Sequence, residues 1–431
     1  MAERIIVSHP GGIARVEGEG EVRLRISGGR VEDVQLRIFE PPRLFEAFLR
    51  GRHCGELPDL TARICGICPV AYQLSACAAV EDACGVEVPA PVRDLRRLLY
   101  CGEWIESHAL HVFFLQAPDA LGYESAFSMA ARHGDVVRGA LQLKQAGNAL
   151  LRAVGGREIH PVNVRVGGFY RAPSQAELAP VAEQLHAVRD FARRMIAWTA
   201  ALPLPDIEED FTFVALQEPD RYAIEGGRMT TTTALDLGPH AFDGHVVEEQ
   251  VPHSTALHAR LRGAGRYLTG PLARYALSGD RLSPAARGAA RDAGLPAVVR
   301  NPFRAIVVRC AEILHAVDEA LALIAAYDPP DPPAVAVAPR AATGAGWTEA
   351  PRGLLWHRYE LAADGTIRDA RIVPPTAQNL ARIEDSVRAR VEGCADLGDE
   401  ALRDRREQTV RTFDPCISCA THFLRLEVDR R

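Results

Sequence analysis

Two stretches decide how this sequence is interpreted: Arg63-Ile-Cys-Gly-Ile-Cys-Pro69 and Asp414-Pro-Cys-Ile-Ser-Cys-Ala-Thr-His422. Each contains a Cys-x-x-Cys pair, and the two pairs lie near opposite ends of the chain. One such turn brings two sulfurs close enough to share a metal ion, and two turns form a four-thiolate site where the fold joins them. We therefore expect the two ends of the chain to meet at a metal.

The spacing alone leaves the metal open. Zinc ribbons place their two pairs within about 20 residues of each other, which argues against a simple structural zinc site. Thiolates are soft ligands that suit nickel, iron, copper or zinc, and an iron–sulfur cluster is a further alternative. The remaining cysteines occur singly, and we expect them to be small buried apolar residues. These are Cys54, Cys77, Cys84, Cys101, Cys310 and Cys394.

Composition indicates a globular protein with a large core. Of 431 residues, 47% are hydrophobic and 25% charged, and the net charge is −6. The basic residues form no stripe, so we expect no nucleic-acid partner. No run of about 18 apolar residues exists, so we expect no membrane span. The N-terminus has no apolar signal-like segment, which favours a cytoplasmic location.

Hydrophobic periodicity predicts a mainly helical protein with small peripheral sheets, of the α+β class. Alternating residues predict one hairpin within 13–39 and another over 354–373. Short strands are expected at 212–215 and 230–235. Apolar residues at three- and four-residue spacing predict helices at 94–115, 136–153, 174–201, 256–278, 302–327, 376–394 and 398–411.

The organisation along the chain follows from these elements. We expect an N-terminal hairpin region (1–60), a helical body (61–328) and a C-terminal part (341–422) that completes the metal site. The proline-rich stretch 329–333 is either a linker or an exposed loop. Residues 423–431 form a short tail.

The flanks of the two cysteine pairs closely resemble the metal-binding signatures of nickel–iron hydrogenase large subunits. The resemblance implies a single large-subunit domain over 1–431 with a central helical bundle. It also implies reversible, heterolytic cleavage of H2 to protons and electrons. Further segments resemble family elements in family order: 15–18, 43–46, 108–111, 267–270, 349–353 and 375–379.

The resemblance assigns roles to the four cysteines. Cys65 and Cys416 correspond to terminal nickel ligands, and Cys68 and Cys419 to ligands that bridge nickel and iron. The iron would carry carbonyl and cyanide ligands installed by maturation proteins. Metal-assisted polarisation of H2 would let a nearby base take a proton, and Cys416 is the candidate first base.

Other residues acquire roles from the same resemblance. Arg352 matches an arginine over the open face of the metals, Asp414 a hydrogen-bonding neighbour, and Glu17 a proton-relay glutamate. Glu46 and His422 match ligands of a structural Mg2+, with a backbone carbonyl near Ile372 as a third contact. His108 and His111, one helical turn apart, line this region or are core histidines.

Tyr72 departs from the family pattern, because many members carry a histidine at this position. The absence of that histidine would remove a hydrogen-bond partner of Cys68. It also points away from the periplasmic uptake type. Family precursors are cut by an endopeptidase after the equivalent of His422, which here would release Phe423–Arg431.

The sequence contains no further cysteine cluster and no Gly-x-Gly-x-x-Gly turn after a strand. Electrons therefore require an iron–sulfur small subunit. The Ile-Ser-Cys motif and short tail resemble the cytoplasmic, bidirectional, NADP-linked sulfhydrogenase-type group, whose further flavin and NAD(P)-binding diaphorase subunits would be partners. A deazaflavin-reducing relative, a regulatory H2 sensor and a structural zinc protein are the alternatives.

Overall fold

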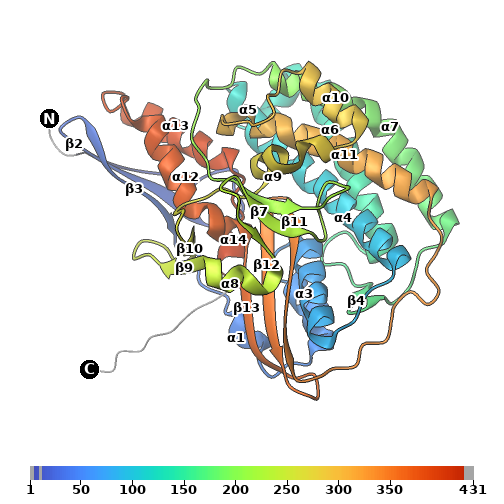
Figure 1. Cartoon of the computed structure of the whole chain (residues 1–431). Coiled ribbons are helices and arrows are strands. Elements are labelled where there is room, and N and C mark those ends of the chain that lie inside the picture. Colours follow the sequence, from blue (N-terminus) through green and yellow to red (C-terminus); the bar gives the residue numbers. More distant parts are fainter. Residues whose placement is uncertain (1–3, 9–11, 422–431) are drawn as a thin grey trace, which may run out of the picture.

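The computed structural model describes residues 4–8 and 12–421, and its largest part is a bundle of long helices (Figure 1). Within the bundle, α4 packs against α6 and α11, and α7 packs against α6 and α11. Serines fix two of the helix starts: Ser125 and Ser174 each accept a hydrogen bond from the third backbone N–H of the helix that follows. The predicted mainly helical class with a central bundle is confirmed. The bundle consists of α4 (Ala90–Leu110), α6 (Ala126–Gly155), α7 (Gln175–Ala200) and α11 (Ala305–Ala325).

A three-stranded antiparallel sheet packs against α3 (Pro69–Cys84), the helix that begins directly after the first cysteine pair. Glycines in its first strand permit the close approach: a Cβ on Gly344 would lie 2.1 Å from the Ala79 carbonyl oxygen. The hairpin predicted over 354–373 is confirmed, and the strand before it was not anticipated. The strands are β11 (Ala342–Ala350), β12 (Gly353–Leu361) and β13 (Ile367–Val373).

A second antiparallel sheet forms the N-terminal region, with strand order β1-β2-β3. The alternation seen in the sequence becomes alternating burial, since Val22, Leu24 and Ile26 face the core. The hairpin predicted within 13–39 is therefore confirmed. The strands are β1 (Arg4–Val7), β2 (Gly20–Ser27) and β3 (Arg30–Ile38), and the short helices α1 (Phe45–Leu49) and α2 (Leu57–Ala62) follow.

The helix predicted over 256–278 is wrong for its first half. Residues Leu257–Leu261 form strand β10, which pairs with β9 (Val246–Gln250), and only Pro271–Ser278 are helical, as α9. The reason is local: Gly263, Gly265 and Gly270 have φ of 78°, 76° and 109°. Those values turn the chain out of a helix, and glycine adopts them without a steric penalty.

The other elements connect these layers. Short strands occur near both predicted positions in the region after 203, as β6 and β7. The proline-rich stretch packs as a loop against the segment around Phe169. The Phe169 amide donates to the Pro333 carbonyl, and the Val335 amide donates to the Gly167 carbonyl, at 3.0 Å each. The remaining elements are α5 (Ala117–Ala120), β4 (Val164–Arg165), β5 (Gly168–Phe169), β6 (Val214–Gln217), β7 (Arg228–Thr231), β8 (Asp236–Leu237), α8 (Phe242–His245), α10 (Pro284–Asp292), α12 (Pro375–Val391), α13 (Asp399–Thr412) and α14 (Ile417–Ala420).

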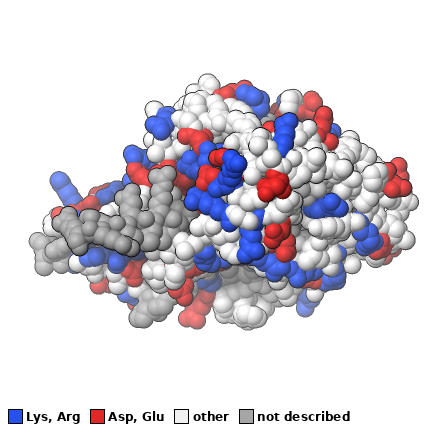
Figure 2. Space-filling model, turned by 90° about the horizontal axis from the view of Figure 1, so that it is seen from below, with Lys and Arg blue, Asp and Glu red and all other residues white. Residues whose placement is uncertain are grey.

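The segments around Glu17 and Cys416, which come from opposite parts of the chain, meet beside α12. Cys416 forms a parallel bridge with Glu17, and the Ile417 amide donates to the Glu17 carbonyl at 3.0 Å. In Figure 1 the C-terminal helices lie next to the N-terminal sheet. Among the described residues no helix is long and apolar enough to cross a membrane. On the face in Figure 2, acidic and basic side chains are interspersed.

Candidate metal centre

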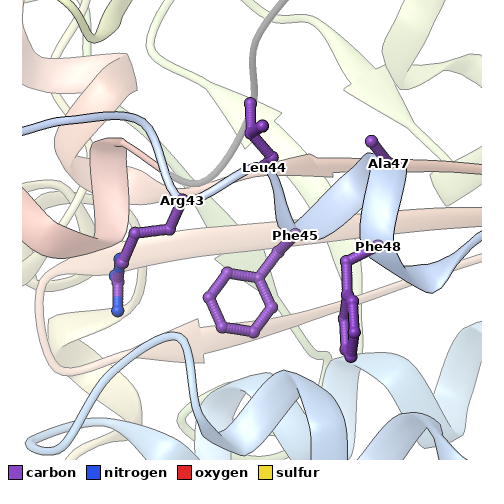
Figure 3. A pocket seen from close by; sticks show the side chains of 5 residues that line it. All are labelled: Arg43, Leu44, Phe45, Ala47 and Phe48. Carbon is purple, nitrogen blue, oxygen red and sulfur yellow. The ribbon is translucent and has the colours of Figure 1, made fainter.

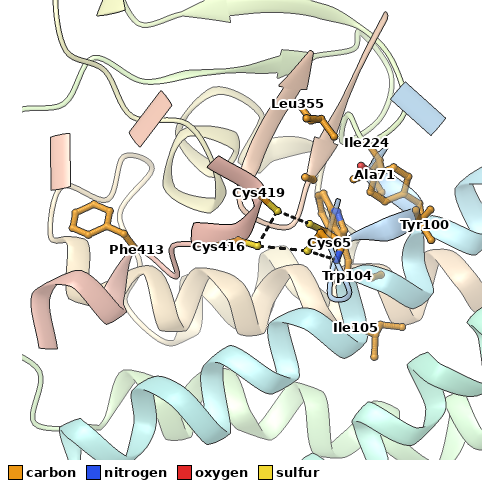
Figure 4. Packing of buried hydrophobic residues seen from close by; sticks show 14 of the residues in the cluster. Cys65, Ala71, Tyr100, Trp104, Ile105, Ile224, Leu355, Phe413, Cys416 and Cys419 are labelled. Carbon is orange, nitrogen blue, oxygen red and sulfur yellow. Dashed lines mark hydrogen bonds between the residues drawn. The ribbon is translucent and has the colours of Figure 1, made fainter. Parts of the chain in front are cut away.

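The two cysteine pairs converge in the interior, and Figure 4 labels three of the four residues, Cys65, Cys416 and Cys419. The Sγ atoms of Cys65 and Cys416 lie 3.5 Å apart, those of Cys68 and Cys419 3.6 Å, and those of Cys416 and Cys419 2.8 Å. All four sulfurs lie within 4.8 Å of one another, and all four residues are buried. The fold therefore forms the four-sulfur cluster that the two motifs predicted.

Local backbone structure positions each pair. Cys65 Sγ accepts hydrogen bonds from the amides of Ile67 and Cys68, both at 3.3 Å, so the turn folds around its own sulfur. Cys68 precedes the first turn of α3, where Pro69 is favourable because its missing N–H would have no helical partner. Cys416 precedes α14, and its amide donates to Thr376 Oγ1 on α12 at 3.0 Å.

The four thiols share their protons unequally. Hydrogen bonds from Cys416, then Cys419 and Cys68, hold the pKa of Cys65 well below its usual range. Burial, followed by hydrogen bonds within the cluster, raises the pKa of Cys416 well above its usual range. Four buried thiolates cannot ionise together without a compensating cation. The cluster is therefore a soft donor set that fits a metal of the nickel or iron type.

A buried arginine supplies positive charge beside these sulfurs. Arg352 Nη2 donates to Asp414 Oδ1 at 3.0 Å, and Arg352 Nε donates to the Asp414 carbonyl at 2.8 Å. Burial disfavours the charged guanidinium, but the charges of Asp414 and Cys416 outweigh that effect and raise the pKa of Arg352. Arg309 lies 3.9 Å from the other Asp414 oxygen. Asp414 thus holds Arg352 in place, and Arg352 in turn favours ionisation of Cys65.

Glu17 connects the cluster with the surface. Its Oε2 accepts hydrogen bonds from the Cys416 thiol at 3.0 Å and from the Ser418 amide at 3.1 Å. The residue is half-buried, and the next acidic residue, Glu19, is exposed. Glu17 is therefore placed where a proton can pass between a buried sulfur and solvent.

The predicted magnesium ligands are placed in part. The Ile372 amide donates to Glu46 Oε1 at 2.7 Å, so these two residues do lie together. Burial raises the pKa of Glu46 to about 8, while the hydrogen bond from the Ile372 amide and the charge of Arg371 act to lower the pKa. His422 and the tail 423–431 lie outside the described residues.

The segment that carries Glu46 also touches both cysteine motifs. The Arg43 guanidinium donates to the carbonyls of Ile64, at 2.6 Å, and Ser418. In Figure 3 the side chains of Arg43, Phe45 and Phe48 point to the same side of this segment, which lines a pocket. Arg43 thus links the flanks of the two motifs.

Tyr72 lies beside the sulfurs although it departs from the family pattern. Burial, and then the charges of Cys419 and Cys68, raise the pKa of its hydroxyl well above the usual range. A neutral phenol therefore occupies this position. His108 and His111 are buried: His108 Nε2 lies 3.0 Å from Glu312 Oε2, and His111 Nε2 lies 2.7 Å from the Arg411 carbonyl oxygen. The charges of both histidines act on Asp414.

Several supporting residues were not singled out from the sequence. The Glu103 carboxylate accepts from the amides of Val70, at 2.6 Å, and Ala71, at 3.2 Å, and so caps α3 next to Cys68. Arg274 joins Glu312 and Glu349 in a buried ion network, with contacts of 2.7 Å and 3.0 Å. The sequence feature that could have predicted this network is the set of charged residues within the apolar helix at 305–326. Because a buried ion needs a partner, such residues indicate a buried network.

Comparison with known proteins agrees with this geometry. The family model for nickel-dependent hydrogenases matches residues 43–136 and 282–422, and the chain belongs to this family as a large, catalytic hydrogenase subunit. It is 34% identical over 421 residues to sulfhydrogenase 2 subunit alpha of Pyrococcus furiosus, covering 96% of this chain and 98% of the relative. It is 32% identical over 418 residues to sulfhydrogenase 1 subunit alpha of the same organism, covering 96% and 97%.

A solved structure extends the likeness to three dimensions. The NAD+-reducing NiFe hydrogenase in its H2-reduced state superposes with a TM-score of 0.87 at 28% identity, covering 97% of this chain and 99% of that one. The predicted large-subunit fold and the sulfhydrogenase-type resemblance are confirmed.

Proposed function

We propose that this subunit holds a nickel–iron centre on its four clustered cysteines and uses it for reversible cleavage of H2. Cys65 and Cys416 would bind nickel terminally, Cys68 and Cys419 would bridge nickel and iron, and carbonyl and cyanide would complete the iron. When bound, the centre supplies a Lewis acid that makes H2 acidic enough to lose a proton. The convergence of four buried sulfurs within 4.8 Å supports this proposal most directly.

The chain's own residues would then handle the proton. Cys416 Sγ is the first acceptor, and Glu17 Oε2, 3.0 Å away, takes the proton next. Because Glu17 is half-buried, its carboxylate can exchange that proton with solvent. Arg352 orients H2 over the sulfurs, held by two hydrogen bonds to Asp414. This division of roles requires only short transfers between groups already in contact.

We further propose a structural Mg2+ bound by Glu46, by a backbone carbonyl near Ile372 and by His422. Oxygen ligands suit this ion, and a cation there would favour the ionised form of the Glu46 carboxyl, whose pKa burial raises. We also propose that residues 1–431 act as one large-subunit unit and that an endopeptidase removes Phe423–Arg431. The intact mass of the purified, metal-loaded subunit is then expected to lack these nine residues; a full-length mass in active enzyme would contradict the cut.

The electrons released from H2 must pass to another subunit. The described residues of this chain form one cysteine cluster, the proposed nickel–iron site, and so leave no second cluster to carry electrons. We propose an iron–sulfur small subunit as the immediate acceptor, followed by flavin and NAD(P)-binding subunits in a cytoplasmic complex. The structural likeness to an NAD+-reducing hydrogenase favours a nicotinamide over a deazaflavin as the final acceptor.

The native complex provides the test. Purified under anaerobic conditions, it is expected to contain nickel and to reduce NADP+ or NAD+ with H2. Reduction of a deazaflavin alone would reassign the acceptor. Metal content without significant turnover would indicate an H2 sensor, and zinc in place of nickel would refute the proposed centre.

A further inference from the structure

A second cluster of metal-ligating side chains lies on residues unconnected with the cysteine motifs. His253, in the loop before β10, His258, in β10, and Glu384, in α12, each offer one ligand atom. These three atoms lie within 4.8 Å of one another. Two imidazoles and a carboxylate form a ligand set that zinc accepts in proteins.

His258 is the most informative member of this cluster. Its exposed fraction is 2%, and its Nε2 is buried without a hydrogen-bond partner. Leaving a buried polar atom unpaired is unfavourable, so such an atom calls for an explanation. Burial, together with the charges of His253 and Arg266, lowers the pKa of His258 to about 3. The imidazole is therefore neutral, which is the form that binds metals.

The other two members already contact each other through a hydrogen bond. His253 Nε2 lies 2.8 Å from Glu384 Oε1. The Leu36 amide of β3 donates to the same oxygen at 2.8 Å, so the carboxylate is oriented by the backbone. A metal ion would replace the proton between His253 and Glu384 and would also pair with the buried nitrogen of His258.

We propose that His253, His258 and Glu384 form a binding site for a divalent transition-metal ion of the zinc class, separate from the four-cysteine centre. Three protein ligands leave a coordination position for water. The His253 side chain is 19% exposed, which opens a route from solvent. The nearby positive charge of Arg266 is offset by its ion pair with Asp385.

Binding at this site would tie together three elements that are distant in sequence. The ligands come from the β9–β10 region and α12, and β3 contributes the orienting amide. The same helix α12 carries Thr376, whose hydroxyl accepts a hydrogen bond from the Cys416 amide. An ion that binds only the folded state stabilises it by mass action. Zinc is therefore expected to raise the thermal unfolding midpoint of the complex.

The test uses the purified hydrogenase complex loaded with ZnCl2 and desalted. Wild type is expected to retain one more zinc per large subunit than H253A or H258Q, by elemental analysis. The exposed His186, on α7, provides the matched control H186A, which should retain zinc like wild type. A circular-dichroism spectrum like that of the wild-type complex will show that the H253A variant folds.

X-ray absorption at the zinc edge separates this site from misloading of the cysteines. The extra zinc is expected to have only nitrogen and oxygen neighbours, including imidazole. A sulfur shell would overturn the proposal, since the ion would then lie on the cysteine cluster. Equal zinc content in wild type and H253A would overturn it as well. Equal zinc content would leave the proposed nickel–iron function unaffected, because that function rests on different residues. The nickel content of the complex before zinc loading tests the nickel–iron centre separately from a sulfur shell around the added zinc.

Discussion

The Cys416→Ser variant is expected to lose nickel and with it H2 turnover. Cys416 is buried and in contact with two other cysteine sulfurs and with Glu17. A serine hydroxyl is a harder donor and does not ionise near neutral pH, so it cannot replace a thiolate toward a soft metal. We expect activity to fall by more than about 100-fold, since even residues that merely orient a metal ligand often contribute about 10- to 100-fold.

Nickel content by elemental analysis and H2-dependent dye reduction measure this effect. The matched control is Cys310→Ser, another buried cysteine, which lies outside the cluster. A hydroxyl there would keep the hydrogen bond with Thr199 that the thiol has. The control should retain nickel and most of its activity. Full nickel retention in Cys416→Ser would disprove the assigned ligand role.

The Glu17→Gln variant is expected to keep both metals while H2/D+ exchange slows by about 10²- to 10⁴-fold, the usual contribution of a positioned acid–base group. Glutamine preserves the length of the side chain and can still accept from the Ser418 amide, which now bonds to Glu17 Oε2. It cannot take up a proton at neutral pH. The loss would therefore lie in proton transfer alone.

Isotope exchange followed by mass spectrometry measures proton transfer, and nickel and iron analysis measures assembly of the metal centre. Together they show which of the two the variant has lost. Glu19→Gln is the matched control, because Glu19 is an exposed carboxylate two residues away and should exchange at the wild-type rate. Wild-type exchange in Glu17→Gln would mean that protons leave by another route.

Much of the fold was accessible from local patterns. The hairpins in 13–39 and 354–373 follow from alternation around turn residues, and the long helices follow from apolar spacing. The helix expected over 256–278 failed, because three glycines with positive φ interrupt an otherwise helical spacing. Strand β11 was missed, since its glycines suit only a sheet already packed against α3.

The sequence by itself determined the family and the four sulfurs, because the ligands lie in two short motifs whose flanks are distinctive. Only the tertiary structure decided how these ligands are supported. Glu103 reaches α3 from α4, and the Thr376 hydroxyl reaches Cys416 from α12. Glu384 joins two histidines of a different segment. Each of these contacts joins residues that are far apart along the chain, so it depends on packing, which no local pattern of residues encodes.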